Sequence, residues 1–129
     1  MAVISTGIWP GVSSLLAKKV VHLAGGVNEV NKVIFSFHTA GSGNAGPTIL
    51  TATFLILGEN VLIYKNGQAE YRTTASDPND VDFGPKFGPQ KVIRLNLIEC
   101  ESCASMGIPN VETFFGTAPS IWNLSLIHI

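Results

Sequence analysis

The chain has 129 residues, of which 46% are hydrophobic, and its eight Lys and Arg nearly balance its nine Asp and Glu. A single domain of this size can bury about two-thirds of its extended surface in one core. The sequence contains no cluster of basic residues, which argues against nucleic-acid binding. It also contains no apolar run of the ~20 residues that a membrane-spanning helix needs.

A helix is the first expected element, beginning at Pro10-Gly11 and ending near Ala24. Apolar side chains recur along it at helical spacing and predict one buried stripe. This stripe consists of Val12, Leu15, Leu16, Val20 and Leu23. The next segment, residues 30–39, alternates between apolar and polar residues and predicts a strand. Its core-facing side chains are Val33, Phe35 and Phe37.

The expected fold is organised around residues 39–58. A glycine-rich loop over residues 41–46 leads to Pro47, which suits the first turn of a helix. The helix over residues 47–57 is rich in apolar residues, so we expect it to be buried. Glycine allows the backbone to approach another group closely, and a helix N-terminus presents free N–H groups. We therefore expect this loop to face a cleft.

Further strands and one helix are predicted downstream. Asn66-Gly67 separates two alternating segments, which is a strong signal for a hairpin over residues 61–71. The other predicted elements are strands over residues 81–83, 91–97 and 111–115 and a short helix over residues 98–106. This order predicts an α+β fold, with a mixed, largely antiparallel sheet packed by a few helices.

The glycine loop also matches the pattern G-x-G-x-x-G between a strand and a helix, as in a dinucleotide-binding site. The strand after the helix, however, ends without the acidic residue that would hold a ribose. Three interpretations stay open: a dinucleotide site, a loop facing a substrate or domain cleft, and a structural turn. His38, just before the loop, is either an acid–base group or a hydrogen-bonded structural residue.

Cys100 and Cys103 form a CxxC motif. A metal site would need two more ligands, and we expect none. The flanking glutamates disfavour the thiolate that a redox motif requires. We therefore interpret the pair as two thiols on a short helix. Two cysteines do not form a disulfide framework, which predicts a soluble protein in a reducing compartment.

The last six residues, Leu-Ser-Leu-Ile-His-Ile, can be encoded by CTGTCTCTTATACACATC, the end of the common transposase sequencing adapter. We therefore interpret residues 124–129 as translated adapter. Residues 1–123 are then expected to be one partial domain, an internal piece of a longer chain.

Four segments together resemble a known family. They are TGIWPGVS at residues 6–13, TAGSGNAGPT at 39–48, VDFG at 81–84 and FGT…WN within 115–123. In combination they resemble the C-terminal part of saccharopine dehydrogenase-like oxidoreductases, in the branch found in photosynthetic organisms. The similarity extends over essentially all of residues 1–123.

This resemblance implies the second domain of a Rossmann-type oxidoreductase, truncated at both ends. The missing N-terminal Rossmann domain of the same chain would bind NAD or NADP. The present chain would be the substrate or dimerisation domain, inactive and without cofactor by itself, in the cytoplasm or a plastid. A homodimer is the other partner considered. The alternative function is a non-enzymatic ligand-binding or assembly module on the same scaffold.

No catalytic residue is carried over from the family. The residues expected to face a ligand or the interdomain cleft are Trp9, Pro10, Gly11, His38, Gly41, Ser42, Gly43, Asn44 and Gly46.

Overall fold

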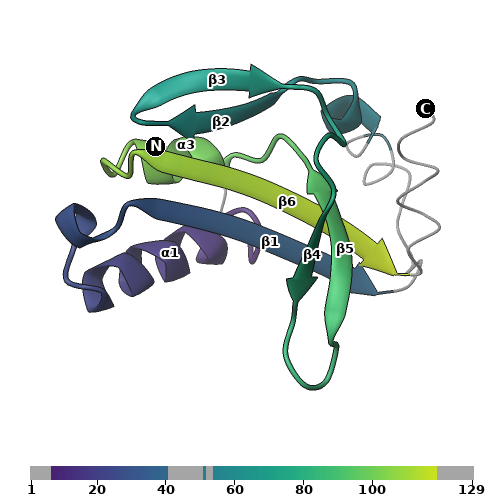
Figure 1. The fold of residues 1–129 in the computed structure, drawn as a ribbon, viewed down its shortest axis with the longest axis horizontal. Helices are drawn as coiled ribbons and strands as arrows, with labels where there is room; N and C mark the ends of the chain where they lie inside the picture. Colours follow the sequence, from purple (N-terminus) through teal and green to yellow (C-terminus); the bar gives the residue numbers. More distant parts are fainter. Residues whose placement is uncertain (1–6, 41–50, 52–53, 119–129) are drawn as a thin grey trace.

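The computed structural model describes residues 7–40, 51 and 54–118, which form a six-stranded, largely antiparallel sheet with a few helices (Figure 1). The predicted α+β class is therefore confirmed. The helical elements are α1 (Val12–Leu23), the short 3-10 helix η1 (Val27–Glu29) and α3 (Glu99–Ala104). The strands are β1 (Lys32–Ala40), β2 (Val61–Lys65), β3 (Gln68–Arg72), β4 (Asn79–Asp82), β5 (Pro89–Arg94) and β6 (Asn110–Ala118). No helix within the described residues is long and apolar enough to cross a membrane.

Strand β6 is the centre of the sheet. One of its edges pairs in parallel with β1 along nine residues, from Lys32 opposite Asn110 onwards. Its other edge pairs antiparallel with β2 near its start and with β5 near its end. β3 then extends the sheet from β2, and β4 extends it from β5. β6 therefore pairs with three strands: β1 along one edge, and β2 and β5 along the other.

Gly116 lies inside β6, although the sequence predicted that this strand ends at Phe115. The strand continues to Ala118. A Cβ atom at Gly116 would lie only 2.3 Å from the carbonyl oxygen of Lys91. Glycine at this position therefore allows β5 to approach the central strand, whereas the sequence pattern predicted that the strand had already ended.

The hairpin predicted at Asn66-Gly67 is confirmed. Both residues have positive φ, 50° and 77°, as a type I′ turn requires. The turn is also anchored to the start of β6 and the residue before it. The N–H of Gly67 donates to the carbonyl oxygen of Pro109 at 2.8 Å, and the N–H of Asn66 donates to Asn110 Oδ1 at 2.9 Å.

The core lies between the sheet and the two helices α1 and α3. Its buried residues are Ala17, Val21, Cys100, Cys103, Ile108 and Val111, with Val33 and Phe35 among the half-buried residues packed against them. The predicted core face of β1 is therefore confirmed. This cluster therefore joins α1 and α3 to the strands β1 and β6.

The stripe predicted to bury α1 is wrong. Leu16, Val20 and Leu23 are 59%, 63% and 71% exposed, whereas Ala17 and Val21 are buried. These two small residues are four positions apart and therefore share one face, which packs into the core. Both faces of the helix carry apolar residues, so helical periodicity alone could not show which face is buried. The prediction favoured the face with the larger side chains.

The predicted helix over residues 47–57 lies partly outside the described residues. Thr51 and residues 54–57 are helical, and the N–H of Gly58 donates back to the carbonyl oxygen of Phe54 at 3.2 Å. Its predicted burial is wrong for Phe54 and Leu55, which are 48% and 67% exposed. Among the described residues of this segment, only Ile56 and Leu57 are half-buried.

Candidate functional site

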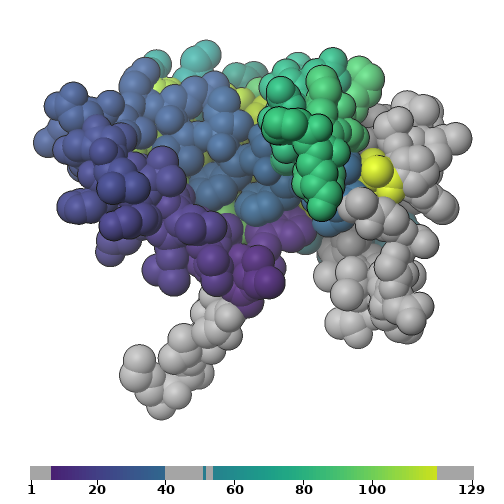
Figure 2. All heavy atoms as spheres, turned by 90° about the horizontal axis from the view of Figure 1, so that it is seen from below, coloured from purple at the N-terminus to yellow at the C-terminus, as the bar shows by residue number. Residues whose placement is uncertain are grey.

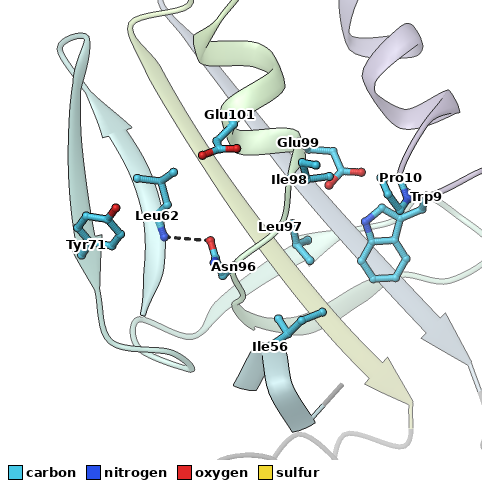
Figure 3. A pocket seen from close by; sticks show the side chains of 10 residues that line it. All are labelled: Trp9, Pro10, Ile56, Leu62, Tyr71, Asn96, Leu97, Ile98, Glu99 and Glu101. Carbon is cyan, nitrogen blue, oxygen red and sulfur yellow. Dashed lines mark hydrogen bonds between the residues drawn. The ribbon is translucent and has the colours of Figure 1, made fainter. Parts of the chain in front are cut away.

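A cavity of about 850 Å³ lies beside the N-terminal start of α1, between the helices and the β2–β3 hairpin (Figure 3). Its lining residues are Trp9, Pro10, Ile56, Leu62, Tyr71, Asn96, Leu97, Ile98, Glu99 and Glu101. This volume lies within the range of about 300–1,000 Å³ that is typical of small-molecule sites. The lining combines a mostly apolar surface with a few polar groups, as such sites do.

One wall is the turn that precedes α1. The N–H groups of Val12 and Ser13 donate to the carbonyl oxygens of Gly7 and Ile8, at 3.0 and 3.1 Å. These bonds close the turn around Trp9 and Pro10.

The Trp9 ring is held in place by the sheet. It stacks on the rings of Phe37 and Phe115, with centroids 4.6 and 5.3 Å apart. Aromatic pairs at such distances stabilise their arrangement beyond the burial of their area. The wall of the cavity that Trp9 forms is therefore positioned by both β1 and β6.

The opposite wall is tied together by Asn96, in the connection between β5 and α3. Its Oδ1 accepts a hydrogen bond of 3.2 Å from the N–H of Leu62, and its Nδ2 donates to Glu59 Oε2 at 3.0 Å (Figure 3). Both ends of the amide have protein partners. Asn96 therefore positions the connection between β5 and α3 against β2. Because its amide is already paired, we expect other lining residues of the cavity to contact a ligand.

Glu99 is the unusual residue of the cavity because its side chain is ionisable yet only 1% exposed. Its Oε1 accepts a hydrogen bond of 2.6 Å from Ser13 Oγ. Its Oε2 has no hydrogen-bond partner among the described residues. The carboxylate points toward Trp9 and Pro10 (Figure 3). A buried polar atom without a partner costs about 1–3 kcal/mol, so this oxygen is suited to a donor that enters the cavity.

The cleft residues predicted from the sequence separate into three groups. Trp9 and Pro10 line the cavity, and Gly11 closes the turn by a bridge to Gly7. His38 lies elsewhere on β1, where its ring contacts that of Phe83 with centroids 5.4 Å apart. The positions Gly41, Ser42, Gly43, Asn44 and Gly46 lie outside the described residues.

Sequence reasoning missed Glu99 and Asn96. In the sequence, Glu99 stands out only as a neighbour of the CxxC motif, because a glutamate at the start of a helix is usually exposed. The signal that could have identified it is its place at the start of a short helix with two cysteines, which suggested a buried face.

The two thiols of the CxxC motif are free and buried. Burial raises the pKa of Cys100 to about 12 and that of Cys103 to about 11. The Cys100 thiol donates to the carbonyl oxygen of Val111 at 3.6 Å. Both cysteines are therefore protonated core side chains at neutral pH, as the interpretation of a non-redox pair expects. Within residues 7–40, 51 and 54–118, no group of three or more His, Cys, Asp or Glu could hold a metal ion.

A second polar cluster lies around Arg94 at the end of β5 and Glu112 on β6. Glu112 directly follows the core-facing Val111, so its side chain lies on the opposite face of the sheet. Arg94 Nη1 lies 2.5 Å from Glu112 Oε2, and Lys32 forms a second ion pair with the same carboxylate. Burial would raise the pKa of Glu112, but hydrogen bonds from Lys32 and Arg94 outweigh it and lower the pKa overall. The charges of this cluster satisfy one another, so we regard it as structural.

No protein-family model matches this chain, and no curated protein matches it either.

Proposed function

We propose that the chain is the substrate domain of an NAD(P)-dependent oxidoreductase of the saccharopine dehydrogenase-like type, and that the cavity beside Trp9 holds the substrate. The observation that carries this proposal is the position of the TGIWPGVS motif, residues 6–13, on which the resemblance partly rests. This motif supplies two residues of the cavity wall, Trp9 and Pro10. It also supplies the hydroxyl of Ser13 that holds Glu99.

A second observation supports a further domain beside this one. The outer face of α1 is apolar but uncovered, with Leu15, Leu16, Val20 and Leu23 all more than half exposed. Figure 2 shows this side of the molecule, with α1 at the surface. A helix that is apolar on both faces is suited to burial between two layers. An uncovered apolar face of this kind suits an interdomain contact, here with the Rossmann domain.

In this proposal the chain binds and orients the substrate, while hydride transfer depends on the nicotinamide held by the Rossmann domain. The chain alone therefore binds substrate without turning it over. The alternative is a ligand-binding module without redox chemistry, which the cavity and its buried carboxylate would also serve.

The experiment that separates them is recovery of the reading frame upstream of residue 1 in the source transcript, followed by expression of the longer chain. We expect a first strand followed by G-x-G-x-x-G, and binding of NADH or NADPH by the longer protein. The 129-residue chain is the matched control and should bind neither. A longer chain with no such motif and no binding of either nucleotide would overturn the oxidoreductase and favour the module.

A further inference from the structure

We propose that the cavity recognises a protonated amine on an apolar body, with the ammonium group placed at Glu99 Oε2. This inference rests on the proposed function, because it assumes that the cavity holds a small-molecule substrate. It adds the chemical class of that substrate and the residue that selects it.

The first step is the hydrogen bonding of the Glu99 carboxylate. One oxygen accepts from Ser13 Oγ at 2.6 Å, while the other lacks a donor among the described residues. An ionised carboxylate accepts hydrogen bonds and donates none, so the group it selects must be a donor. An ammonium group offers three donors and a compensating charge, and charge-assisted hydrogen bonds are about twice as strong as neutral ones.

The second step is the charge of the lining. Glu99 and Glu101 both line the cavity, and its described lining residues include no Lys, Arg or His. A ligand carboxylate or phosphate would meet two like charges and no counter-charge. A wholly apolar ligand would leave Glu99 Oε2 without a donor. A cation is the ligand group that satisfies both the charge and the hydrogen bond.

The third step is the shape of the remaining surface. Ile56, Leu62 and Leu97 present apolar side chains, and Trp9 adds an aromatic ring. Glu99 is buried, whereas Tyr71, on the far side of the cavity in Figure 3, is 70% exposed, so the exposed end of the lining lies toward Tyr71. An amine that reaches Glu99 therefore has its apolar body along the lining and its far end toward Tyr71.

A purely structural role for Glu99 makes a different prediction. In that case the carboxylate joins α1 to α3 through Ser13, and a water molecule satisfies Oε2. Ligands that enter the cavity would then be ranked by apolar surface, with no preference for an amine.

The test uses three probes with the same chain length and different head groups: hexylamine, 1-hexanol and hexanoate. Each is titrated into the complete chain near neutral pH and followed by NMR at the indole N–H of Trp9, which Trp122→Phe distinguishes from that of Trp122. We expect hexylamine to bind about tenfold or more tightly than 1-hexanol, as a charged hydrogen bond implies. Hexanoate should bind most weakly.

Two variants test which carboxylate produces the preference for hexylamine. Glu99→Gln keeps the shape of the side chain and removes its charge, so it should retain 1-hexanol binding and lose the preference for hexylamine. Glu101→Gln is the matched control at the exposed carboxylate and should keep most of that preference. If Glu99→Gln fails to fold, the ranking of the three probes on the unaltered chain decides by itself.

The outcomes separate the two proposals. Equal binding of hexylamine and 1-hexanol, or a preference for hexylamine that survives in Glu99→Gln, overturns the amine inference and leaves a small-molecule cavity in place. Failure of all three probes to shift the Trp9 signal overturns both the inference and the assignment of the cavity as the substrate site.

Discussion

The hydroxyl of Ser13 donates a hydrogen bond of 2.6 Å to Oε1 of Glu99, 86 positions further along the chain. The bond joins the first turn of α1 to the first residue of α3. It also fixes one oxygen of a buried carboxylate at the wall of the cavity. One contact thus connects the packing of the helices with the geometry of the site.

Ser13→Ala should lower the free energy of unfolding by about 1–3 kcal/mol, because both oxygens of the buried Glu99 carboxylate would then lack the protein donor. Urea denaturation measures the change. Ser14→Ala is the matched control, since it makes the same substitution at the next position of the helix and keeps the Glu99 contact; its effect should stay within about 0.5 kcal/mol. Equal effects of the two variants would show that the hydrogen bond contributes little.

Gly116→Ala should destabilise the protein by about 1–3 kcal/mol or more, because the added methyl group would overlap the carbonyl oxygen of Lys91 at 2.3 Å and force β5 away from β6. The measurement is again the midpoint of urea unfolding. Gly58→Ala provides the control, since its nearest backbone atom would lie at an ordinary contact distance of 3.5 Å. A Gly116→Ala protein as stable as Gly58→Ala would contradict the close approach of the two strands.

The outer face of α1 should cause the isolated chain to associate. Leu16 and Val20 are 59% and 63% exposed, so Leu16→Glu with Val20→Lys should reduce association at unchanged net charge and with little loss of stability. Sedimentation velocity over a range of concentrations measures the effect. Ala17→Glu is the contrasting variant, because it places a charge in the core and should prevent folding. A chain that is monomeric at high concentration before substitution would rule this prediction out.

Stability should fall above pH 9 because of the two buried thiols. Burial raises their pKa from 9.0 to about 12 and about 11 in the folded state. Below pH 9 the thiols are protonated in both the folded and the unfolded chain, so their burial does not make the stability depend on pH there. As the pH rises, the unfolded thiols ionise first and the unfolded state is favoured, until the folded pKa values are reached.

Urea unfolding from about pH 8 to about pH 10.5 tests this pH dependence. Cys100→Ser with Cys103→Ser is the control, because serine does not ionise in this range. The variant should start from a lower stability and lose it less steeply with pH. Parallel slopes in the two proteins would show that the thiols do not contribute to alkaline unfolding.

Local sequence signals were sufficient for most element types. Asn66-Gly67 specified its hairpin because only a few residues adopt positive φ at low cost, and that preference acts within the turn itself. The alternation of Val33 and Phe35 likewise indicated the core face of β1. The α+β class follows from such local patterns in chain order.

The sequence by itself also indicated that the TGIWPGVS motif matters, and two of its residues do line the cavity. Only the tertiary structure decided which side of α1 is buried, because Ala17 and Val21 match the space beside α3 while larger apolar residues occupy the other side. It alone showed that Gly116 serves a close approach of two strands. It alone brought Glu99 beneath Ser13. Each of these depends on atoms distant in sequence, and their packing is a property of the folded chain that no local pattern encodes.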